Sequence, residues 1–330
     1  MRDFVYDRAD SADAAQTAAK EGARAIAGGT NLLDLMKHEV ETPDRLIDVN
    51  RTGLDQIEEA DGGLRIGALV RNADLAAEER VRRDWPLLSR AILAGASPQI
   101  RNRATTAGNL MQRTRCAYFY DLGSACNKRS PGSGCDALNG VNRMHAILGT
   151  SEHCIATYPG DMAVALVALD AEVEIAGANG KRTVPIAEFH RLPGDRPDRD
   201  NVLEDGEIIL GVTLPKPTGG AQVYRKVRDR RSYAFALVSA AVDVTVEDGK
   251  ITRAALTLGS VAAKPWRSNE ADKVLVGSEP SRKAFENAAD RLLQGAQGHG
   301  ENDYKIGLAR RTLVAALAEA TGIDIAGDAA

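Results

Sequence analysis

The four cysteines of this 330-residue chain all fall in one segment, at Cys116, Cys126, Cys135 and Cys154. Thiolate sulfur is a soft ligand, so four thiolates select zinc or an iron–sulfur cluster over hard cations. The segment is rich in Gly, Ser, Asn, Asp and Pro, which predicts irregular backbone that can wrap around a bound group. Long irregular insertions in compact domains are commonly functional, so we interpret 112–156 as a metal or cluster loop.

The spacing of the cysteines, C-x9-C-x8-C-x18-C, leaves alternatives open. It matches neither the paired C-x2-C of zinc ribbons nor the short-spaced run of bacterial ferredoxins. Separate reduced thiols fit it, and so do two disulfides if the chain is exported. The N-terminus has no apolar signal-peptide core, so we expect folding in the cytoplasm, where metal ligation is favoured. Export of the folded chain with a partner that carries a signal, into the periplasm, stays open.

The composition limits the classes of protein to which this chain can belong. Hydrophobic residues make up 44% and charged residues 27%, and the net charge is -4. The length allows two or three domains, each with its own core. No excess of positive charge is present to attract nucleic acid or anionic lipid. The longest aliphatic run, 162–169, is too short to cross a bilayer, so neither nucleic-acid binding nor membrane insertion is expected.

Two glycine-containing turns come before the cysteine loop. Gly28-Gly29, in IAGGTNLLDLMK, follow a short predicted strand and precede a predicted helix. Such glycines leave backbone N–H groups open to an anion such as pyrophosphate. Gly108-Asn109, in ATTAGNL, suit a backbone that approaches a ligand closely. Neither turn is a G-x-G-x-x-G or P-loop motif, so each could also be a simple strand–helix turn.

Hydrophobic patterns predict a mixed α+β chain. The Pro/Gly-rich stretch 215–220 predicts a domain boundary. Beyond it an antiparallel sheet with a tight hairpin turn at Asp248-Gly249 is expected, with strands at 222–227, 236–246 and 253–260. Two helices are expected at 282–294 and 304–320. The tail from Gly322 is expected to be frayed.

Four stretches, taken in order, resemble the flavin-binding subunit of the xanthine dehydrogenase (molybdenum hydroxylase) family. They are IAGGTNLLDLMK, RNRATTAGNL, HCIATYPGDMAVALVALDA and YRKVRDRRSYAFALVSAAV. The cysteine insertion resembles that of the flavin subunit of bacterial periplasmic aldehyde oxidoreductases, and is similar in kind to that of 4-hydroxybenzoyl-CoA reductase. The resemblance implies an FAD-binding domain of the vanillyl-alcohol-oxidase (PCMH) type over 1–215, with α/β subdomains 1–60 and 61–215. It also implies a C-terminal domain of the CO-dehydrogenase-flavoprotein type, an antiparallel sheet with a helical bundle, over 221–322.

The resemblance further implies two cofactors, FAD and a [4Fe–4S] cluster held by the four cysteines. FAD would lie between the N-terminal subdomains and the start of the C-terminal domain. Its pyrophosphate and ribityl chain would be wrapped by Ala27, Gly28, Gly29, Thr30, Asn31, Leu32 and Leu33. Other contacts would come from Thr105, Gly108, Asn109, Asp161, Leu210 and Lys226. Asp161 also fits a simple helix N-cap, and the basic run 225–231 also fits a solvated strand edge. Of the histidines only His153 adjoins a cysteine, and it is interpreted as shaping the loop.

These observations predict an electron-transfer flavoprotein subunit without catalytic residues of its own. A large molybdopterin-binding partner would oxidise an aldehyde or related substrate. A small partner with [2Fe–2S] centres would pass the electrons to FAD, which would deliver them to an external acceptor. The stretch LAGASPQIRN lacks the aromatic residue that packs on the flavin in xanthine oxidase, so its NAD-binding face is not expected here. The alternative is a zinc-stabilised binding or scaffold protein without redox activity.

Overall fold

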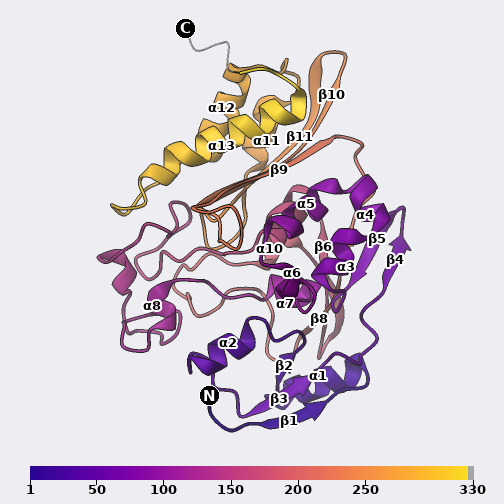
Figure 1. Ribbon diagram of the computed structural model, residues 1–330, viewed down its shortest axis with the longest axis vertical. Helices are drawn as coiled ribbons and strands as arrows, with labels where there is room; N and C mark the ends of the chain where they lie inside the picture. Colours follow the sequence, from indigo (N-terminus) through magenta and orange to yellow (C-terminus); the bar gives the residue numbers. More distant parts are fainter. Residues whose placement is uncertain (326–330) are drawn as a thin grey trace.

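The computed structural model describes residues 1–325, in which three β-sheets follow one another along the long axis (Figure 1). The end of the tail that was expected to fray, 326–330, lies outside the described residues. Ile323 and Ile325 pack against the C-terminal core, so the expectation of fraying was wrong for that part of the tail.

The first sheet has three parallel strands in the order β1-β3-β2. They are β1 Val5–Arg8, β2 Arg24–Ile26 and β3 Arg45–Asp48. Helix α1 (Ala12–Lys20) connects β1 to β2 and begins at Ser11, whose hydroxyl oxygen accepts a hydrogen bond from the Ala14 N–H at 3.1 Å. Helix α2 (Leu32–Lys37) follows the first glycine turn, as the sequence predicts.

The second sheet has five strands in the order β4-β5-β8-β6-β7, and every neighbouring pair is antiparallel. The strands are β4 Ile57–Ala60, β5 Gly63–Gly67, β6 Glu172–Gly177, β7 Gly180–Pro185 and β8 Ile208–Leu214. This sheet therefore begins before residue 61. Its core is completed by α3 Asn72–Ala77, α4 Glu79–Asp84, α5 Pro86–Ala94, α9 Met162–Ala168 and α10 Ile186–Phe189. Every residue of α9 is buried, as its unbroken apolar run requires.

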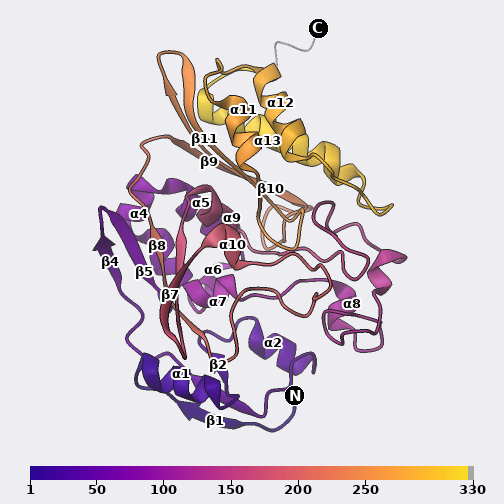
Figure 2. The ribbon, with the colours of Figure 1, turned by 180° about the vertical axis from the view of Figure 1, so that it is seen from behind.

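The segment between α5 and α9 carries the second glycine turn and the cysteine loop. It is mostly irregular, as predicted, with only short helical turns. These are α6 Pro98–Arg101, α7 Thr106–Leu110, α8 Ala117–Tyr120 and the 3-10 turn η1 Asp136–Leu138. In Figures 1 and 2 the cysteine loop around α8 lies at one side of the molecule, between α2 and the C-terminal helices.

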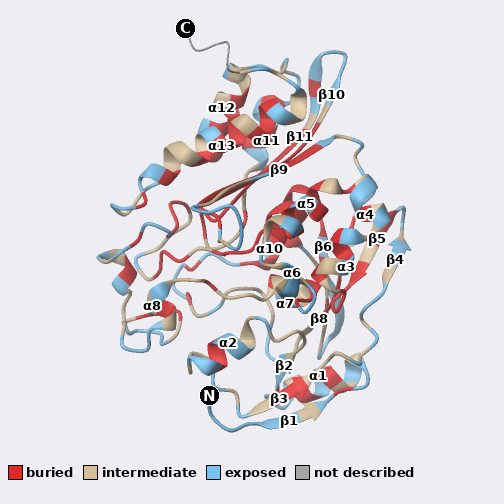
Figure 3. Cartoon of the chain, in the orientation of Figure 1, coloured by how far each residue is buried: buried red, intermediate tan, exposed pale blue. Residues whose placement is uncertain are grey.

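The third sheet has four antiparallel strands in the order β12-β11-β10-β9. They are β9 Ala221–Val227, β10 Val238–Glu247, β11 Lys250–Gly259 and β12 Trp266–Arg267. The predicted hairpin is confirmed, with φ of 50° at Asp248 and 76° at Gly249. Three helices cover one face, α11 Asn269–Leu275, α12 Arg282–Leu292 and α13 Tyr304–Thr321; β12 and α11 were not predicted. Buried residues follow the interior of this sheet and of its neighbour (Figure 3).

Within residues 1–325, no helix is both long enough and apolar enough to cross a membrane.

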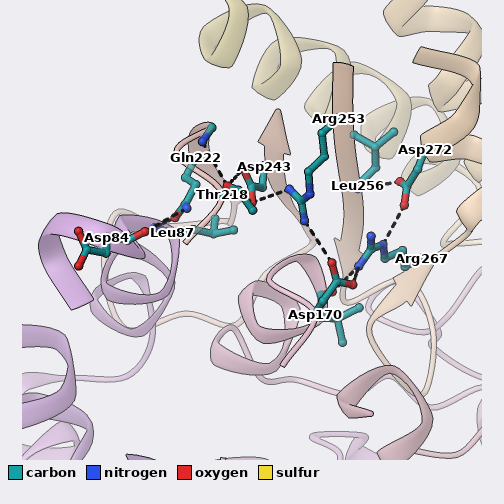
Figure 4. A network of polar contacts seen from close by, with 12 residues as sticks. Asp84, Leu87, Asp170, Thr218, Gln222, Asp243, Arg253, Leu256, Arg267 and Asp272 are labelled. Carbon is teal, nitrogen blue, oxygen red and sulfur yellow. Dashed lines mark hydrogen bonds and ion pairs between the residues drawn. The ribbon is translucent and has the colours of Figure 1, made fainter. Parts of the chain in front are cut away.

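A polar network joins the third sheet to the end of α9 (Figure 4). Asp243 on β10 has no exposed surface, and its carboxylate accepts hydrogen bonds from Arg253 at 2.7 Å and Thr218 at 3.0 Å. Arg253 also reaches Asp170, which follows α9 and in turn accepts from Arg267. Burial raises the pKa of Asp243, against the opposing effect of Arg253. Because Thr218 lies in the Pro/Gly-rich stretch, the network also anchors the segment that connects the two halves.

Replacing the buried carboxylate should therefore destabilise the protein far more than replacing the exposed one. We expect Asp243→Ala to lower the free energy of unfolding by about 2–4 kcal/mol, since it leaves Arg253 and Thr218 without their buried acceptor. Asp170→Ala, in the same network but 53% exposed, should cost less than about 1 kcal/mol. Urea unfolding of both variants measures the difference, and equal losses would contradict this account.

Candidate functional site

Close backbone approach explains the two glycines of the first turn. A Cβ atom on Gly28 would lie 2.0 Å from the carbonyl oxygen of Arg103, so no larger residue fits there. Gly29 has φ of 70°, in the left-handed region that costs other residues about 1 kcal/mol or more. The first turn therefore lies directly against the residues that lead into the second turn. With only six residues, α2 adds little dipole of its own to this site.

Two polar residues that the sequence analysis missed hold the turns together. The Asn50 side-chain amide donates to the carbonyl of Ala27 at 3.0 Å. Arg71 donates both to Asn50 Oδ1 at 2.8 Å and to the Arg103 carbonyl at 2.6 Å. Asn50 comes two residues after β3 and Arg71 comes four residues after β5, and this position after a strand is the one sequence signal that could have indicated them.

Asn31 in the first turn carries an unpaired donor. Its Oδ1 accepts a hydrogen bond from the Arg113 N–H at 2.9 Å. Its Nδ2 is buried and has no hydrogen-bond partner among residues 1–325. A buried N–H group without an acceptor costs about 1–3 kcal/mol, so this position fits an oxygen-rich group such as a phosphate. Of the other predicted contacts in this turn, Thr30 and Leu33 are exposed and Ala27 and Leu32 are half-buried.

The second turn is held by its own residues and by the segment before α9. Thr105 Oγ1 accepts from the N–H of Gly108 at 3.2 Å and so caps α7. The carbonyl of Asn109 accepts from the Tyr158 hydroxyl at 3.0 Å, and Gln112 donates to its Oδ1 at 3.0 Å. These contacts bring the second turn next to the residues that lead into Asp161.

Leu210 is connected to the second turn through the backbone. Its carbonyl in β8 accepts from the N–H of Ala68 at 3.0 Å, and the Ala68 carbonyl accepts from Ala107 at 2.9 Å. Leu210 is 5% exposed. A predicted FAD contact far along the chain therefore lies two backbone hydrogen bonds from Ala107, which adjoins the predicted FAD contacts Gly108 and Asn109 of the second turn.

Asp161 and Lys226 form a buried ion pair. The Lys226 Nζ lies 2.8 Å from Asp161 Oδ2, and the two side chains are 4% and 9% exposed. The hydroxyl of Tyr224 donates to Asp161 Oδ1 at 2.6 Å, and burial raises the pKa of Tyr224 well above its usual value. Asp161 stands at the N-cap of α9, as the alternative interpretation expected, but its side chain accepts no capping hydrogen bond and pairs with Lys226 instead.

The basic run 225–231 was interpreted both as part of the FAD site and as a solvated strand edge, and each interpretation fits some of its residues. Lys226 is buried and also donates to the Ala94 carbonyl at 3.1 Å, as Arg228 does at 3.0 Å. Arg225 is exposed and pairs with Glu319 at 2.9 Å. The run is therefore a solvated edge on one face only, and Lys226 points into the interior.

All four cysteines line one small, largely enclosed cavity. None of them is in a disulfide, so the disulfide alternative was wrong. Burial raises the pKa of Cys116 to about 12 and that of Cys154 to about 11, and it raises the pKa of Cys135 as well. Such thiols are protonated near neutral pH, and a bound metal must displace those protons. Within residues 1–325, no three His, Cys, Asp or Glu side chains are grouped closely enough for one metal ion.

A buried cation borders this cavity. The side chain of Lys128 lines it, is 4% exposed, and donates to the carbonyl of Pro197 at 2.7 Å and to the Asp200 carboxylate. Asp200 also pairs with Arg113 at 2.8 Å, and these two cations hold the pKa of Asp200 below its usual value against the effect of burial. The network fixes both the loop and the segment before β8.

One histidine contacts a cysteine sulfur, and it is not the one that the sequence singled out. Nε2 of His145 lies 3.1 Å from Sγ of Cys116. His153 borders the cavity, but its Nε2 lies 3.7 Å from a carboxylate oxygen of Glu152. His145 stands 29 positions after Cys116, so no local pattern could indicate the contact.

Helix α2 connects the two parts of the site. The first glycine turn leads into its N-terminal end, while Leu35 on its buried side packs with Phe119 and Cys126 of the cysteine loop. Figure 1 shows α2 between the first sheet and that loop. The predicted dinucleotide site and the cysteine cavity are therefore neighbours.

Comparison with known proteins relates both halves of the chain to one kind of protein. Residues 2–217 match the FAD binding domain in molybdopterin dehydrogenase, and residues 222–320 match the CO dehydrogenase flavoprotein C-terminal domain. The chain is 56% identical to the aldehyde oxidoreductase FAD-binding subunit PaoB of Escherichia coli, over 97% of this chain and 99% of PaoB. It is 29% identical to the carbon monoxide dehydrogenase medium chain of Afipia carboxidovorans, over 93% and 92% of the two chains. A carbon monoxide dehydrogenase structure from Hydrogenophaga pseudoflava superposes with a TM-score of 0.77 at 25% identity, covering 98% of each chain.

Gly28→Ala should abolish FAD binding, because its methyl group would push the first turn away from the Arg103 carbonyl. We expect FAD per chain to fall at least tenfold in the purified variant, measured by absorbance after acid extraction. Gly22→Ala is the matched control, since Gly22 also has positive φ, 88°, but open space around its Cβ position. If Gly28→Ala keeps its full FAD content, the close approach does not shape the site.

His190 should make the protein sensitive to acid. Burial lowers the pKa of His190 to about 4, and its Nε2 lies 2.9 Å from the carbonyl of Leu110 at the end of α7. The unfolded chain takes up a proton near pH 6.5, whereas the folded chain does not until near pH 4. Stability therefore falls as the pH drops below 6.5, by about 1.4 kcal/mol for this histidine at pH 5.5.

His190→Gln removes this titration but keeps a side-chain N–H for Leu110. The difference in free energy of unfolding between wild type and His190→Gln should therefore narrow by about 1.2 kcal/mol from pH 7 to pH 5.5. Urea titrations at the two pH values test this, and parallel pH profiles would show that His190 is not the group responsible.

Proposed function

This chain belongs to the family of FAD-binding subunits of molybdenum hydroxylases, as part of an FAD-dependent oxidoreductase, and from that premise we propose that its own task is electron transfer. A large molybdopterin-binding partner oxidises an aldehyde or related substrate, and a small partner with [2Fe–2S] centres delivers the electrons here. An external acceptor then receives them. The 56% identity to an aldehyde oxidoreductase subunit supports an aldehyde as the substrate class. Bound FAD would supply the two-electron redox chemistry.

The observation that carries this proposal is the position of α2. One end of the helix follows the glycine turn that would hold the dinucleotide, and its buried side forms part of the packing around Cys126. Two candidate redox sites that share one helix suit electron transfer better than they suit a binding protein. No candidate nucleophile or acid–base pair for substrate chemistry accompanies them in the site described above.

Different residues of the chain would contact different parts of FAD. Gly28 and Gly29 let the backbone approach the pyrophosphate, and the free Nδ2 of Asn31 offers it a hydrogen bond. Asp161 neutralises Lys226, so the pair orients polar atoms toward the cofactor without adding net charge. Leu210 contributes an apolar surface suited to the isoalloxazine ring.

We further propose that Cys116, Cys126, Cys135 and Cys154 hold a [4Fe–4S] cluster. All four line one cavity, which fits a single group with four thiolate ligands. In a tetrahedral zinc site the sulfur atoms lie about 3.8 Å apart, and the side chains here are not grouped for one ion. A cluster binds one cysteine at each iron and so accommodates wider spacing. Lys128 places a buried cation beside the anionic site.

Membership of an FAD-binding family argues against the alternative of a scaffold protein without redox activity. The metal content of the purified protein then decides between iron and zinc. Protein purified without oxygen should contain one FAD, about four iron atoms and about four acid-labile sulfides per chain. Stoichiometric zinc with no sulfide would refute the cluster, while absence of FAD would refute the electron-transfer role.

Cys135→Ser should lose the cluster and keep the flavin. We expect iron to fall from about four atoms to fewer than one per chain, because a serine hydroxyl is a poor ligand for iron in a cluster. FAD content should stay close to that of wild type, since Cys135 lies outside both glycine turns. Ser130→Ala, at an exposed position of the same loop, is the control and should keep both. Simultaneous loss of iron and FAD would mean that the two sites do not form independently.

The four thiols also bear on where the protein is assembled. They must be reduced to bind iron, so we propose that the cluster is inserted in the cytoplasm. A complex that then works in the periplasm would have to be exported already folded, by a signal on a partner. Fractionation of cells that express all subunits, with FAD and iron assayed in each fraction, tests this.

A further inference from the structure

We propose that His145 is a positioning residue for the cysteine site, whose Nε2–H donates a hydrogen bond to Sγ of Cys116 and raises the reduction potential of the bound cluster. The inference rests on the proposed [4Fe–4S] cluster. It adds a specific residue outside the four thiolate ligands, contributed from the far part of the cysteine loop.

The contact geometry is that of a hydrogen bond to sulfur. Nε2 and Sγ lie 3.1 Å apart, and His145 is 6% exposed. Two ligands of one tetrahedral metal ion, a sulfur and a nitrogen, would lie about 3.5 Å apart. The shorter separation favours a donor to the sulfur over a fifth ligand.

The chemistry of the pair fixes the direction of the hydrogen bond. A metal-bound thiolate has no proton and can only accept. A hydrogen bond from His145 to a bound thiolate therefore requires the N–H on Nε2. Nδ1 is buried and makes no hydrogen bond of normal geometry among the described residues, although the Asn142 carbonyl lies near the ring.

The C-terminal domain sets the position of His145. Lys305 Nζ donates to the His145 carbonyl at 2.9 Å and to the Ser260 carbonyl at 2.6 Å. Asn302 donates to the His145 carbonyl at 3.3 Å and to that of Ala146 at 3.0 Å. Both donors are completely buried at the start of α13. The ring of His145 is therefore held against Cys116 by contacts with α13, on the side of the loop away from α2.

A hydrogen bond to sulfur has a defined electrostatic effect. Reduction adds negative charge to a cluster and its sulfur ligands, and a hydrogen-bond donor stabilises that charge. Hydrogen bonds to the sulfurs are among the main determinants of the potential of such clusters. Loss of the donor should therefore lower the potential without removing any ligand.

The first test compares variants of the holoprotein by redox titration monitored by EPR. His145→Phe should retain iron, sulfide and FAD but show a lower midpoint potential than wild type. His145→Gln keeps a side-chain N–H and should recover part of the difference. His38→Gln is the matched control, since His38 is exposed and its ring packs against Tyr120 of the same loop without contact to a sulfur. An unchanged potential in His145→Phe, or the same shift in His38→Gln, would overturn the proposal.

The second test uses wild-type protein and does not depend on how a variant folds. Histidine labelled with 15N in the imidazole ring alone is incorporated, and the reduced protein is examined by pulsed EPR. A weak 15N coupling to the cluster signal is expected from the hydrogen bond. A strong coupling would indicate a ligand instead, and no coupling would overturn the contact. Wild-type protein without iron would refute the cluster itself, which separates that failure from the failure of His145 alone.

Discussion

The contact of backbone with backbone at Gly28 is the constraint on which the dinucleotide site depends. The first turn ends a strand of the parallel sheet, and the Arg103 carbonyl belongs to the layer built on the second sheet. Only a residue without a side chain lets the two approach so closely. Asn50 and Arg71 then lock the contact with hydrogen bonds from both sides. The glycine is therefore needed first for joining two sheets, and its use in binding an anion follows from that.

Several buried charges are matched by a partner of opposite sign, which explains how they can be tolerated. Lys226 faces Asp161, and Lys128 and Arg113 share Asp200. Removing an ion from water costs several kcal/mol, and a well-placed partner offsets that cost. Each pair also joins segments at least 65 positions apart. The pairs thus order loops that carry few apolar contacts of their own.

The cysteine loop is held by two different parts of the chain. On one side α2 packs Leu35 against Phe119 and Cys126, and on the other α13 binds the carbonyl of His145. An irregular loop without a sheet or long helix gains its shape from such external contacts. The geometry of its four thiols therefore depends on the N-terminal and the C-terminal parts together. A change in the contact between the N-terminal and C-terminal parts would therefore change the conformation of the cysteine loop.

The sequence by itself determined what depends on neighbouring residues. Strand and helix periodicity, the glycines after β2, the hairpin at Asp248-Gly249 and the clustering of all four cysteines are local features. They were sufficient for the mixed α+β fold class, whereas the predicted FAD contacts came from the family resemblance and stay predictions. Tertiary structure alone decided that His145 and not His153 contacts a cysteine sulfur, that Asp161 pairs with Lys226, and that Asn31 keeps a free buried donor. Such contacts join residues far apart in the chain, and only the packing of complete elements brings them within hydrogen-bond distance.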